Sequence, residues 1–150
     1  MENEKFLSAI YLIIKNEDGN ILFQRRQGTN MWPNCLGLPA GHVDVGENAY
    51  EAAIREANEE LCIIITKDDI LDTFIVNRIN KSLPPYYDVY FCLSSYEGII
   101  ENKEPFRCSE LVWEDINNLS EDVIEYEQNS INNYLKGIKF SVIYTDNQDK

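Results

Sequence analysis

The chain has 150 residues, of which 44% are hydrophobic, so its length and composition fit one globular domain over residues 1–150. Its 26 acidic and 13 basic residues give a net charge of −13, which argues against a nonspecific nucleic-acid binder because such a protein needs a basic surface. Four cysteines without C-x-x-C spacing, one histidine and no apolar stretch near the roughly 20 residues of a membrane span argue against a zinc site and a membrane protein, and predict a cytoplasmic chain with reduced thiols.

Two strands joined by a tight turn are predicted first. Phe6–Lys15 is nearly all apolar and rich in isoleucine, which indicates a buried strand, and Ile21–Arg26 is the predicted return strand. The intervening Glu17–Asn20 carries a strong hairpin signal. Because side chains alternate along a strand, Arg25 and Arg26 end the second strand on opposite faces. We select Arg26 as a candidate contact to a substrate phosphate, with an ordinary surface arginine as the alternative.

The predicted loop Gln27–Cys35 carries the first aromatic candidate. Trp32 lies in this loop, where its ring can stack on a nucleobase; the alternative is a side chain that covers one edge of the core. The segment Leu36–Gly41 follows, and its glycines allow a tight backbone path. His42 lies in the next turn, and we expect a structural or exposed histidine there rather than a general base.

A helix is predicted to begin after Asn48. This residue is a favourable N-cap, and Glu51 stands three residues later, where a capping-box acid belongs. Several alanines and a leucine in the next turns favour the helix. Apolar residues at i, i+4, i+7 and i+11 predict the stripe that faces the core. That stripe consists of Tyr50, Ile54, Ala57 and Leu61.

Three carboxylates gather on the predicted opposite face of this helix. Glu56, Glu59 and Glu60 lie there within about one turn, together with Ala49, Ala52 and Ala53. Like charges at this spacing repel each other, and Arg55 balances only part of the charge. A hard divalent cation would neutralise them, because carboxylate oxygens are the ligands that Mg²⁺ and Mn²⁺ prefer. The alternative is an acidic face in contact with solvent.

The spacing around this helix resembles the Nudix box of the Nudix hydrolase family. Gly41, five residues, Glu47, seven residues and then Arg55–Ile63 match all six glycine, glutamate and arginine positions of the box before its final glycine. With each residue type at very roughly 5–10% usage, such a match arises by chance on the order of once in ten thousand sequences or more rarely. Cys62 replaces the second glycine, where a left-handed residue is often needed. A cysteine there costs about 1 kcal/mol, or the helix ends differently.

The rest of the chain predicts further strands and one more helix. The helix is expected over Glu121–Lys136, with Ser120 as its N-cap and Gly137 as its stop. A long polar connection covers Tyr96–Ser109, and a loose tail covers Thr145–Lys150. The β-branched and apolar runs indicate five strands. These strands are Cys62–Thr66, Leu71–Ile79, Tyr86–Ser95, Leu111–Trp113 and Lys139–Tyr144.

The resemblance implies a metal site and names its ligands. It implies that Glu59 and Glu60 bind the metal, and that Glu56 binds metal or acts as general base toward the attacking water. A carboxylate beside Mg²⁺ has its pKa lowered, which favours the ligand role for Glu56. The family also uses a backbone carbonyl at the position of Ala40. The implied cofactor is Mg²⁺, with Mn²⁺ as a possible substitute.

The resemblance also implies residues that support the ligands. Arg55 orients the glutamates, and Glu47 supports the arrangement through a hydrogen bond to Arg55. Nudix proteins often supply one more metal-binding acid from a loop that follows the middle strands. Glu104, before a proline, resembles that loop acid most closely, and Glu110 is the second candidate.

The order of elements predicts an α/β fold with a mixed β-sheet covered by helices on both sides, and the resemblance implies the same α/β/α sandwich. The implied reaction is hydrolysis of the pyrophosphate linkage in a nucleoside diphosphate linked to another group. The Pro-Ala-Gly-His segment and compact length resemble members that act on nucleoside triphosphates. We expect a nucleotide partner, no nucleic-acid polymer, and a monomer or homodimer. The alternatives are a non-catalytic nucleotide-binding or regulatory module, and an acidic ion-binding module without nucleotide.

Overall fold

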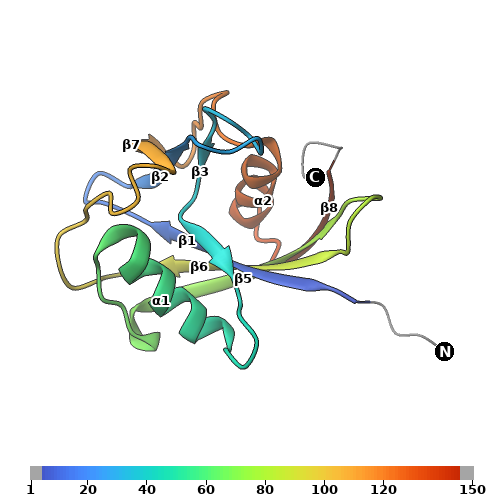
Figure 1. Cartoon of the computed structure of the whole chain (residues 1–150), viewed down its shortest axis with the longest axis horizontal. Coiled ribbons are helices and arrows are strands. Elements are labelled where there is room, and N and C mark those ends of the chain that lie inside the picture. The colour runs from blue at the N-terminus through green and yellow to red at the C-terminus, as the bar shows by residue number, and fades with distance from the viewer. Residues whose placement is uncertain (1–4, 146–150) are drawn as a thin grey trace.

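The structure is a computed structural model that describes residues 5–145, so the predicted tail, apart from Thr145, lies outside the described residues. Strands dominate it, and two helices lie on opposite sides of the largest sheet (Figure 1). The elements in chain order are β1 (Leu7–Ile14), β2 (Asn20–Arg26), β3 (Leu36–Gly37), β4 (Ala40–His42), α1 (Ala49–Leu61), the 3-10 helix η1 (Lys67–Asp69), β5 (Ile70–Ile79), β6 (Tyr86–Leu93), β7 (Cys108–Asp115), α2 (Glu125–Leu135) and β8 (Phe140–Tyr144).

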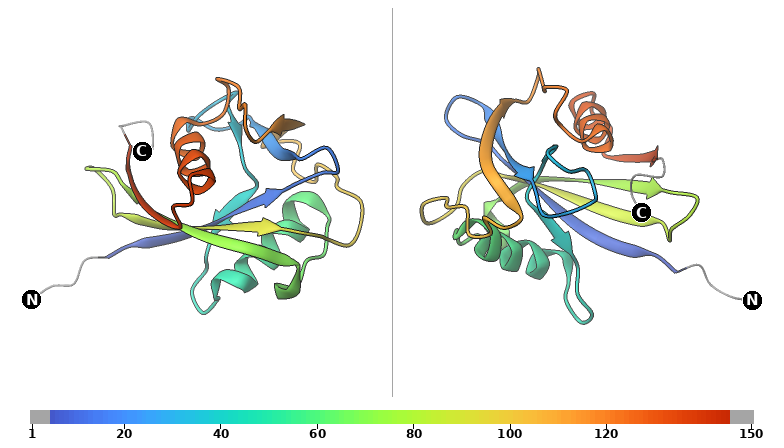
Figure 2. Two further views of the ribbon diagram at one scale, coloured as in Figure 1. Left: turned by 180° about the vertical axis from the view of Figure 1, so that it is seen from behind. Right: turned by 45° about the horizontal axis from the view of Figure 1, so that its top comes forward.

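The main sheet is mixed and has the strand order β4-β1-β6-β5-β8. Strand β1 is parallel to β6 and antiparallel to β4, whereas β5 is antiparallel to β6 and parallel to β8. Alternate residues of β1 belong to opposite cores: Ile10, Leu12 and Ile14 pack with α1, and Ala9, Tyr11 and Ile13 pack with α2. The two helices cover opposite faces of the sheet (Figure 2), which confirms the predicted α/β/α sandwich with a mixed sheet.

The predicted turn is present, but the strands on its two sides enter different sheets. The Asn16 amide donates to the Asn20 carbonyl at 2.9 Å, and Gly19 supplies the positive φ of 81°. Only one bridge, between Lys15 and Ile21, then joins the two segments. Strand β2 instead pairs with β3 and β7 in a second, antiparallel sheet of three strands. Strand β2 therefore lies outside the main sheet. Its pairing with β7 places the end of β2 beside the loop that precedes β7.

One predicted strand is absent, and the second helix begins later than predicted. Cys62–Thr66 is no strand, because only Ile64 forms a bridge there, to Glu97. The second helix begins at Glu125 rather than Glu121. The amide and hydroxyl of Ser120 both donate to the Glu114 carboxylate, at 2.7 and 3.0 Å, so Ser120 caps no helix. Glu121 and Asp122 form a turn, and Asp122 and Ile124 exchange backbone hydrogen bonds with Leu36 of β3, so the helix begins only after them.

The predicted core stripe of α1 is also partly wrong. Ala57 and Leu61 are buried as expected, but Tyr50 and Ile54 lie at the margin with 38% and 37% exposure. Ala52 and Ala53 are fully buried instead, because small side chains let the helix approach the sheet closely. The face of α1 that contacts the sheet is therefore rotated from the predicted stripe toward the acids. The prediction that the acids lie opposite the core is wrong for Glu60, which is itself buried.

The two helices of the described segment, residues 5–145, contain 13 and 11 residues. Neither is long and apolar enough to cross a membrane. What the fold does provide is a junction where the end of β2 with the loop after it, β4, α1 and the loop before β7 meet. The candidate residues from the sequence are distributed over these segments and the turn before α1.

Candidate active site

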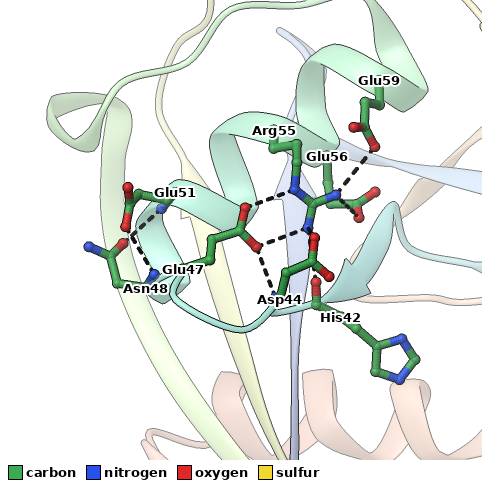
Figure 3. A network of polar contacts seen from close by, with 8 residues as sticks. All are labelled: His42, Asp44, Glu47, Asn48, Glu51, Arg55, Glu56 and Glu59. Atoms are coloured by element: carbon green, nitrogen blue, oxygen red, sulfur yellow. Dashed lines mark hydrogen bonds and ion pairs between the residues drawn. The ribbon is translucent and has the colours of Figure 1, made fainter.

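Helix α1 begins and ends as its sequence requires. The Asn48 side chain accepts from the Glu51 amide at 2.8 Å, and the Glu51 carboxylate accepts from the Asn48 amide at 3.0 Å, so the predicted capping box is present (Figure 3). At the other end, Cys62 has a φ of 61° and its amide donates to the carbonyls of Ala57 and Asn58. A left-handed residue therefore does follow the helix, and here it is a cysteine.

Arg55 is the centre of a polar network beside this helix (Figure 3). Its Nε and Nη2 atoms donate to both carboxylate oxygens of Glu47, at 2.8 and 3.0 Å. Nη2 also donates to the His42 carbonyl at 3.0 Å and lies 3.4 Å from the Asp44 carboxylate. The hydrogen bonds from Arg55, together with one from the Asp44 amide, lower the pKa of Glu47 to about 2. Glu47 is thus a fixed anion that holds Arg55 in place.

The third nitrogen of the Arg55 guanidinium donates hydrogen bonds to two of the candidate metal ligands. Its Nη1 atom donates to Glu56 at 2.7 Å and to Glu59 at 3.3 Å. On its other side, Glu56 lies directly against Gly41: a Cβ atom at Gly41 would meet the Glu56 Oε1 atom at 2.1 Å. The first glycine of the box is therefore required because any side chain there would displace the Glu56 carboxylate.

Glu60 has a different environment, because it points into the protein. Only 8% of its surface is exposed, and its Oε2 atom has no hydrogen-bond partner among the described residues. Burial raises the pKa of Glu60 well above its ordinary value, and the nearby charges of Glu56 and Glu104 raise it further. A buried carboxylate oxygen without a donor is costly, and a bound cation would remove that cost.

The acids face a cavity of about 450 Å³ that also reaches aromatic side chains. Seven of the sequence candidates line it: Arg26, Trp32, Ala40, Glu56, Glu59, Glu60 and Glu104. Glu47 and Arg55 stand behind this lining as its support. Glu110, the second loop candidate, lies elsewhere, because it pairs with Arg25 at 2.7 Å. The structure therefore brings Glu104, and not Glu110, to the cavity.

The donor set suits a hard divalent cation but is not closed. Within residues 5–145, no three histidine, cysteine or acidic side chains are already arranged to hold a metal, since Glu56 and Glu59 turn toward Arg55. All of the gathered donors are oxygens, as Mg²⁺ and Mn²⁺ require. The partnerless oxygen of Glu60 fits a first ligand, and rotation of its acidic neighbours would complete the set.

Several residues of the cavity were not found from the sequence. Arg78 pairs with Asp88 at 2.7 Å, and its guanidinium lies 4.1 Å from the centre of the Tyr86 ring and 4.5 Å from that of Tyr126. The available signal was an arginine close to the end of a predicted strand, directly before Ile79. The Tyr86 hydroxyl also contacts His42 at 2.9 Å, so this histidine has a structural partner.

Trp32 adopts an uncommon backbone conformation, with a φ of 53°. Its ring packs 6.1 Å from that of Tyr126, at a tilt of 58°. The side chain covers one edge of a core, which is one of the two alternatives from the sequence. It also lines the cavity, where stacking on a nucleobase stays a prediction. Unusual backbone geometry of this kind is frequent at functional sites.

Comparison with known proteins agrees with the fold and with the box. The family model of the NUDIX domain matches residues 5–134. Over 55 residues, the chain is 40% identical to a putative 8-oxo-dGTP diphosphatase of Bacillus subtilis, a match that covers 37% of this chain and 34% of that protein. Over 61 residues, it is 36% identical to an RNA pyrophosphohydrolase of Shewanella piezotolerans, with coverage of 41% and 33%. The match thus spans about a third of the length of these curated relatives.

Two solved structures share the fold over most of their length. The MutT NUDIX hydrolase from Burkholderia pseudomallei superposes with a TM-score of 0.70 at 22% identity, covering 86% of this chain and 98% of that chain. The MutT protein from Methanosarcina mazei Go1 gives a TM-score of 0.74 at 18% identity, with coverage of 91% and 98%. At these identities the likeness concerns the fold alone.

Proposed function

This chain belongs to the Nudix family, and on that basis we propose that it is a metal-dependent hydrolase that cleaves the pyrophosphate linkage of a nucleoside diphosphate linked to another group. The observation that carries the proposal is the Glu60 carboxylate. It is buried, one of its oxygens has no partner among the described residues, and it lies beside Glu56 and Glu104 at a cavity large enough for a ligand.

The metal ligands in this proposal are Glu56, Glu59, Glu60, Glu104 and the carbonyl of Ala40. When bound, Mg²⁺ or Mn²⁺ would polarise the phosphoryl oxygens and stabilise the charge that develops during hydrolysis. Before binding, Glu56 and Glu59 pair with Arg55. Glu56 is assigned as a ligand, with general base toward the attacking water as its alternative role.

The remaining candidates bind the substrate. Arg26 would contact a phosphate, and its side chain is oriented by a hydrogen bond from its Nε atom to the Met31 carbonyl at 3.0 Å. Trp32 would stack on the nucleobase, in the part of the cavity that Tyr86 and Tyr126 also line. A nucleotide would then run from the aromatic end of the cavity toward the acids.

A nucleoside triphosphate is the substrate class that we propose. The 8-oxo-dGTP diphosphatase among the relatives is named for such a substrate. The RNA pyrophosphohydrolases suggest the end of an RNA instead, but a net charge of −13 disfavours a polymer of phosphates. The four free thiols suit the reducing cytoplasm, and we propose a monomer or homodimer.

The test is a panel of nucleotides incubated with the protein and Mg²⁺, with released phosphate and pyrophosphate as the readout. Turnover of at least one nucleoside triphosphate is the expected result. Binding of nucleotides without any turnover would favour the alternative, a non-catalytic nucleotide-binding or regulatory module on the same fold. The presence of all the acids of the box speaks for the enzyme, because a sensor has no need of them.

A further inference from the structure

We propose that a second, smaller cavity beside the acids binds a phosphate-class anion, and that Arg107 determines its specificity. The inference rests on the proposed function, because this anion is the group that departs when the linkage is cleaved. In that reaction the water oxygen bonds to the attacked phosphorus and the bridging P–O bond breaks. Its electron pair remains on the departing phosphate or pyrophosphate, and the protons of water pass to the solvent.

The two cavities share five lining residues, and their remaining linings differ. Arg26, Ala40, Glu60, Glu104 and Arg107 line both of them. The larger cavity continues to the aromatic rings described above, whereas no aromatic side chain of residues 5–145 lines the smaller one. A nucleotide with its base among the rings would therefore carry its other end past the acids into the smaller cavity. The remaining lining of that cavity is Gln24, Gln27, Gly28, Thr29 and Cys108.

The size of the smaller cavity limits what it accepts. It measures about 300 Å³, which is at the lower end of the range of about 300–1,000 Å³ for ligand sites. Its lining offers amides, a hydroxyl and two guanidinium groups, which are donors to phosphate oxygens. A phosphate or pyrophosphate suits this lining, whereas a second nucleoside would find no ring to stack on. The cavity thus favours nucleoside triphosphates over dinucleotides.

Two loops that are locked together build this cavity. The Gln27 amide donates to the Arg107 carbonyl at 2.9 Å, and the Gln27 side chain donates to the Pro105 carbonyl. Gly28 has a φ of 66°, and a Cβ atom there would lie 2.6 Å from the Phe106 carbonyl oxygen. Only glycine permits this approach, so the walls of the cavity are formed before any ligand binds. Preformed walls reduce the ordering cost of binding.

The charge of the shared lining residues supports an anion. Under the proposed function the carboxylates of Glu60 and Glu104 bind the metal, so the arginines remain for the substrate. Arg26 lines both cavities, as Arg107 does, but its side chain is already held by its bond to the Met31 carbonyl. Arg107 is exposed, and its guanidinium lies 5.7 Å from the centre of the Phe106 ring. It is therefore free to turn to an anion at the mouth of the smaller cavity, where it would form a bidentate pair.

The experiment is calorimetric titration of the protein, in saturating Mg²⁺, with inorganic pyrophosphate and separately with orthophosphate. The variants are Arg107→Gln, Arg107→Lys and Lys103→Gln. Lys103 is an exposed residue of the same loop outside both linings, so its substitution removes the same charge without touching the cavity. The expected results are a loss of affinity of about 10-fold or more for Arg107→Gln, a smaller loss for Arg107→Lys, and a change below about twofold for Lys103→Gln. The comparison of pyrophosphate with orthophosphate shows which of the two anions the cavity prefers.

Equal losses in Arg107→Gln and Lys103→Gln, no loss in either, or no binding of either anion to the unaltered protein would each overturn the inference. Its failure is distinguishable from failure of the proposed function. Nucleotide turnover without binding that depends on Arg107 overturns the subsite and leaves the hydrolase. Binding that depends on Arg107, without any nucleotide turnover, supports the anion subsite and overturns the hydrolase.

Discussion

Helices α1 and α2 cover opposite faces of one sheet, and each buries a glutamate. On α2, Glu127 is 2% exposed and accepts the Leu38 amide at 2.7 Å. On α1, Glu60 is 8% exposed and has a carboxylate oxygen without a partner among the described residues. The first acid is satisfied by the backbone of the chain, and the second faces a cavity with its own oxygen unused.

The difference separates an acid that serves the fold from one that serves a ligand. Burial raises the pKa of both groups, that of Glu127 to about 8. Glu127 gains a fixed donor and ties α2 to the chain after β3. A hydrogen bond with the Gln24 side chain lowers the pKa of Glu60, but burial and the neighbouring charges of Glu56 and Glu104 outweigh it. Burial of either carboxylate lowers the stability of the folded protein. Only at Glu60 would a bound cation offset that loss, because only this carboxylate faces a cavity.

The largest effect is expected from Glu60→Gln. Turnover should fall by about a thousandfold, since loss of a ligand removes about 4 kcal/mol of the several that a catalytic ion supplies. The melting temperature without metal should hold or rise, because repulsion with Glu56 and Glu104 is relieved. Turnover in Mg²⁺ and thermal unfolding in excess chelator measure the two effects. Near-normal turnover of this variant would show that the acids of α1 are assigned wrongly.

The matching change on α2, Glu127→Gln, should act on stability and on its pH dependence. Glutamate has a pKa of about 4.3 in the unfolded chain, and that of Glu127 is raised to about 8 in the fold. Between those values the folded state holds a proton that the unfolded state has lost, so the free energy of unfolding falls as pH rises. Glutamine keeps the acceptor for Leu38 and does not titrate.

From pH 5 to pH 8, the unaltered protein should therefore lose about 3–4 kcal/mol more stability than Glu127→Gln. Chemical unfolding at several pH values measures this difference. The acids of α1 are present in both proteins, so their contribution cancels in the comparison. Parallel stability curves would mean that Glu127 is ionised in the fold, and the contrast with Glu60 would then be lost.

The third effect concerns the loop acid that approaches Glu60. Glu104→Gln should require several-fold more Mg²⁺ for half-maximal rate, because Glu104 lines the cavity with the other candidate ligands. Glu110→Gln removes only a pair with Arg25 and should leave the titration unchanged. Glu110 is exposed and Glu104 is half-buried. Each change is to a neutral isostere, so stability should shift by less than about 0.5 kcal/mol. A shift in the Glu110→Gln titration alone would identify Glu110 as the ligand.

The smallest effect compares the two helix ends. Helix α2 is followed by Gly137 with a φ of 87°, whereas α1 is followed by Cys62 with a φ of 61°. Cys62→Gly should therefore stabilise the protein by about 0.5–1 kcal/mol, which corresponds to roughly 2–4 °C in Tm at this length. Turnover should be unchanged, since Cys62 lines neither cavity. A lower Tm would show that packing of the thiol outweighs the backbone strain.

Local patterns in the sequence predicted the elements, but their pairing depends on contacts far apart in the chain. The turn at Gly19 is correct, yet β2 leaves β1 because its partner is β7, some 90 residues later. The helical wheel placed Ile54 in the core from its hydrophobicity alone. Burial follows the closest approach of two surfaces, and Ala52 and Ala53 allow that approach better than larger residues do.

The residues of the candidate site also divide into those that local spacing predicts and those that only long-range contacts bring together. The spacing of the box sufficed to select Glu56, Glu59 and Glu60, because one helix carries all three. Arg78 and Arg107 were missed, since each comes from a different segment and no local spacing joins them to the box. The buried state of Glu60 was likewise unpredictable, because it follows from the rotation of α1 on the sheet.

The central claim is that the open oxygen of Glu60 belongs to a metal site, and direct measurement of metal binding tests it. Mn²⁺ binding by electron paramagnetic resonance, with Mg²⁺ as competitor, should be compared in the unaltered protein, Glu60→Gln and Glu127→Gln. We expect Glu60→Gln to weaken Mn²⁺ binding by at least about 10-fold, and Glu127→Gln to bind Mn²⁺ as the unaltered protein does. Equal binding by Glu60→Gln and the unaltered protein would contradict the central claim.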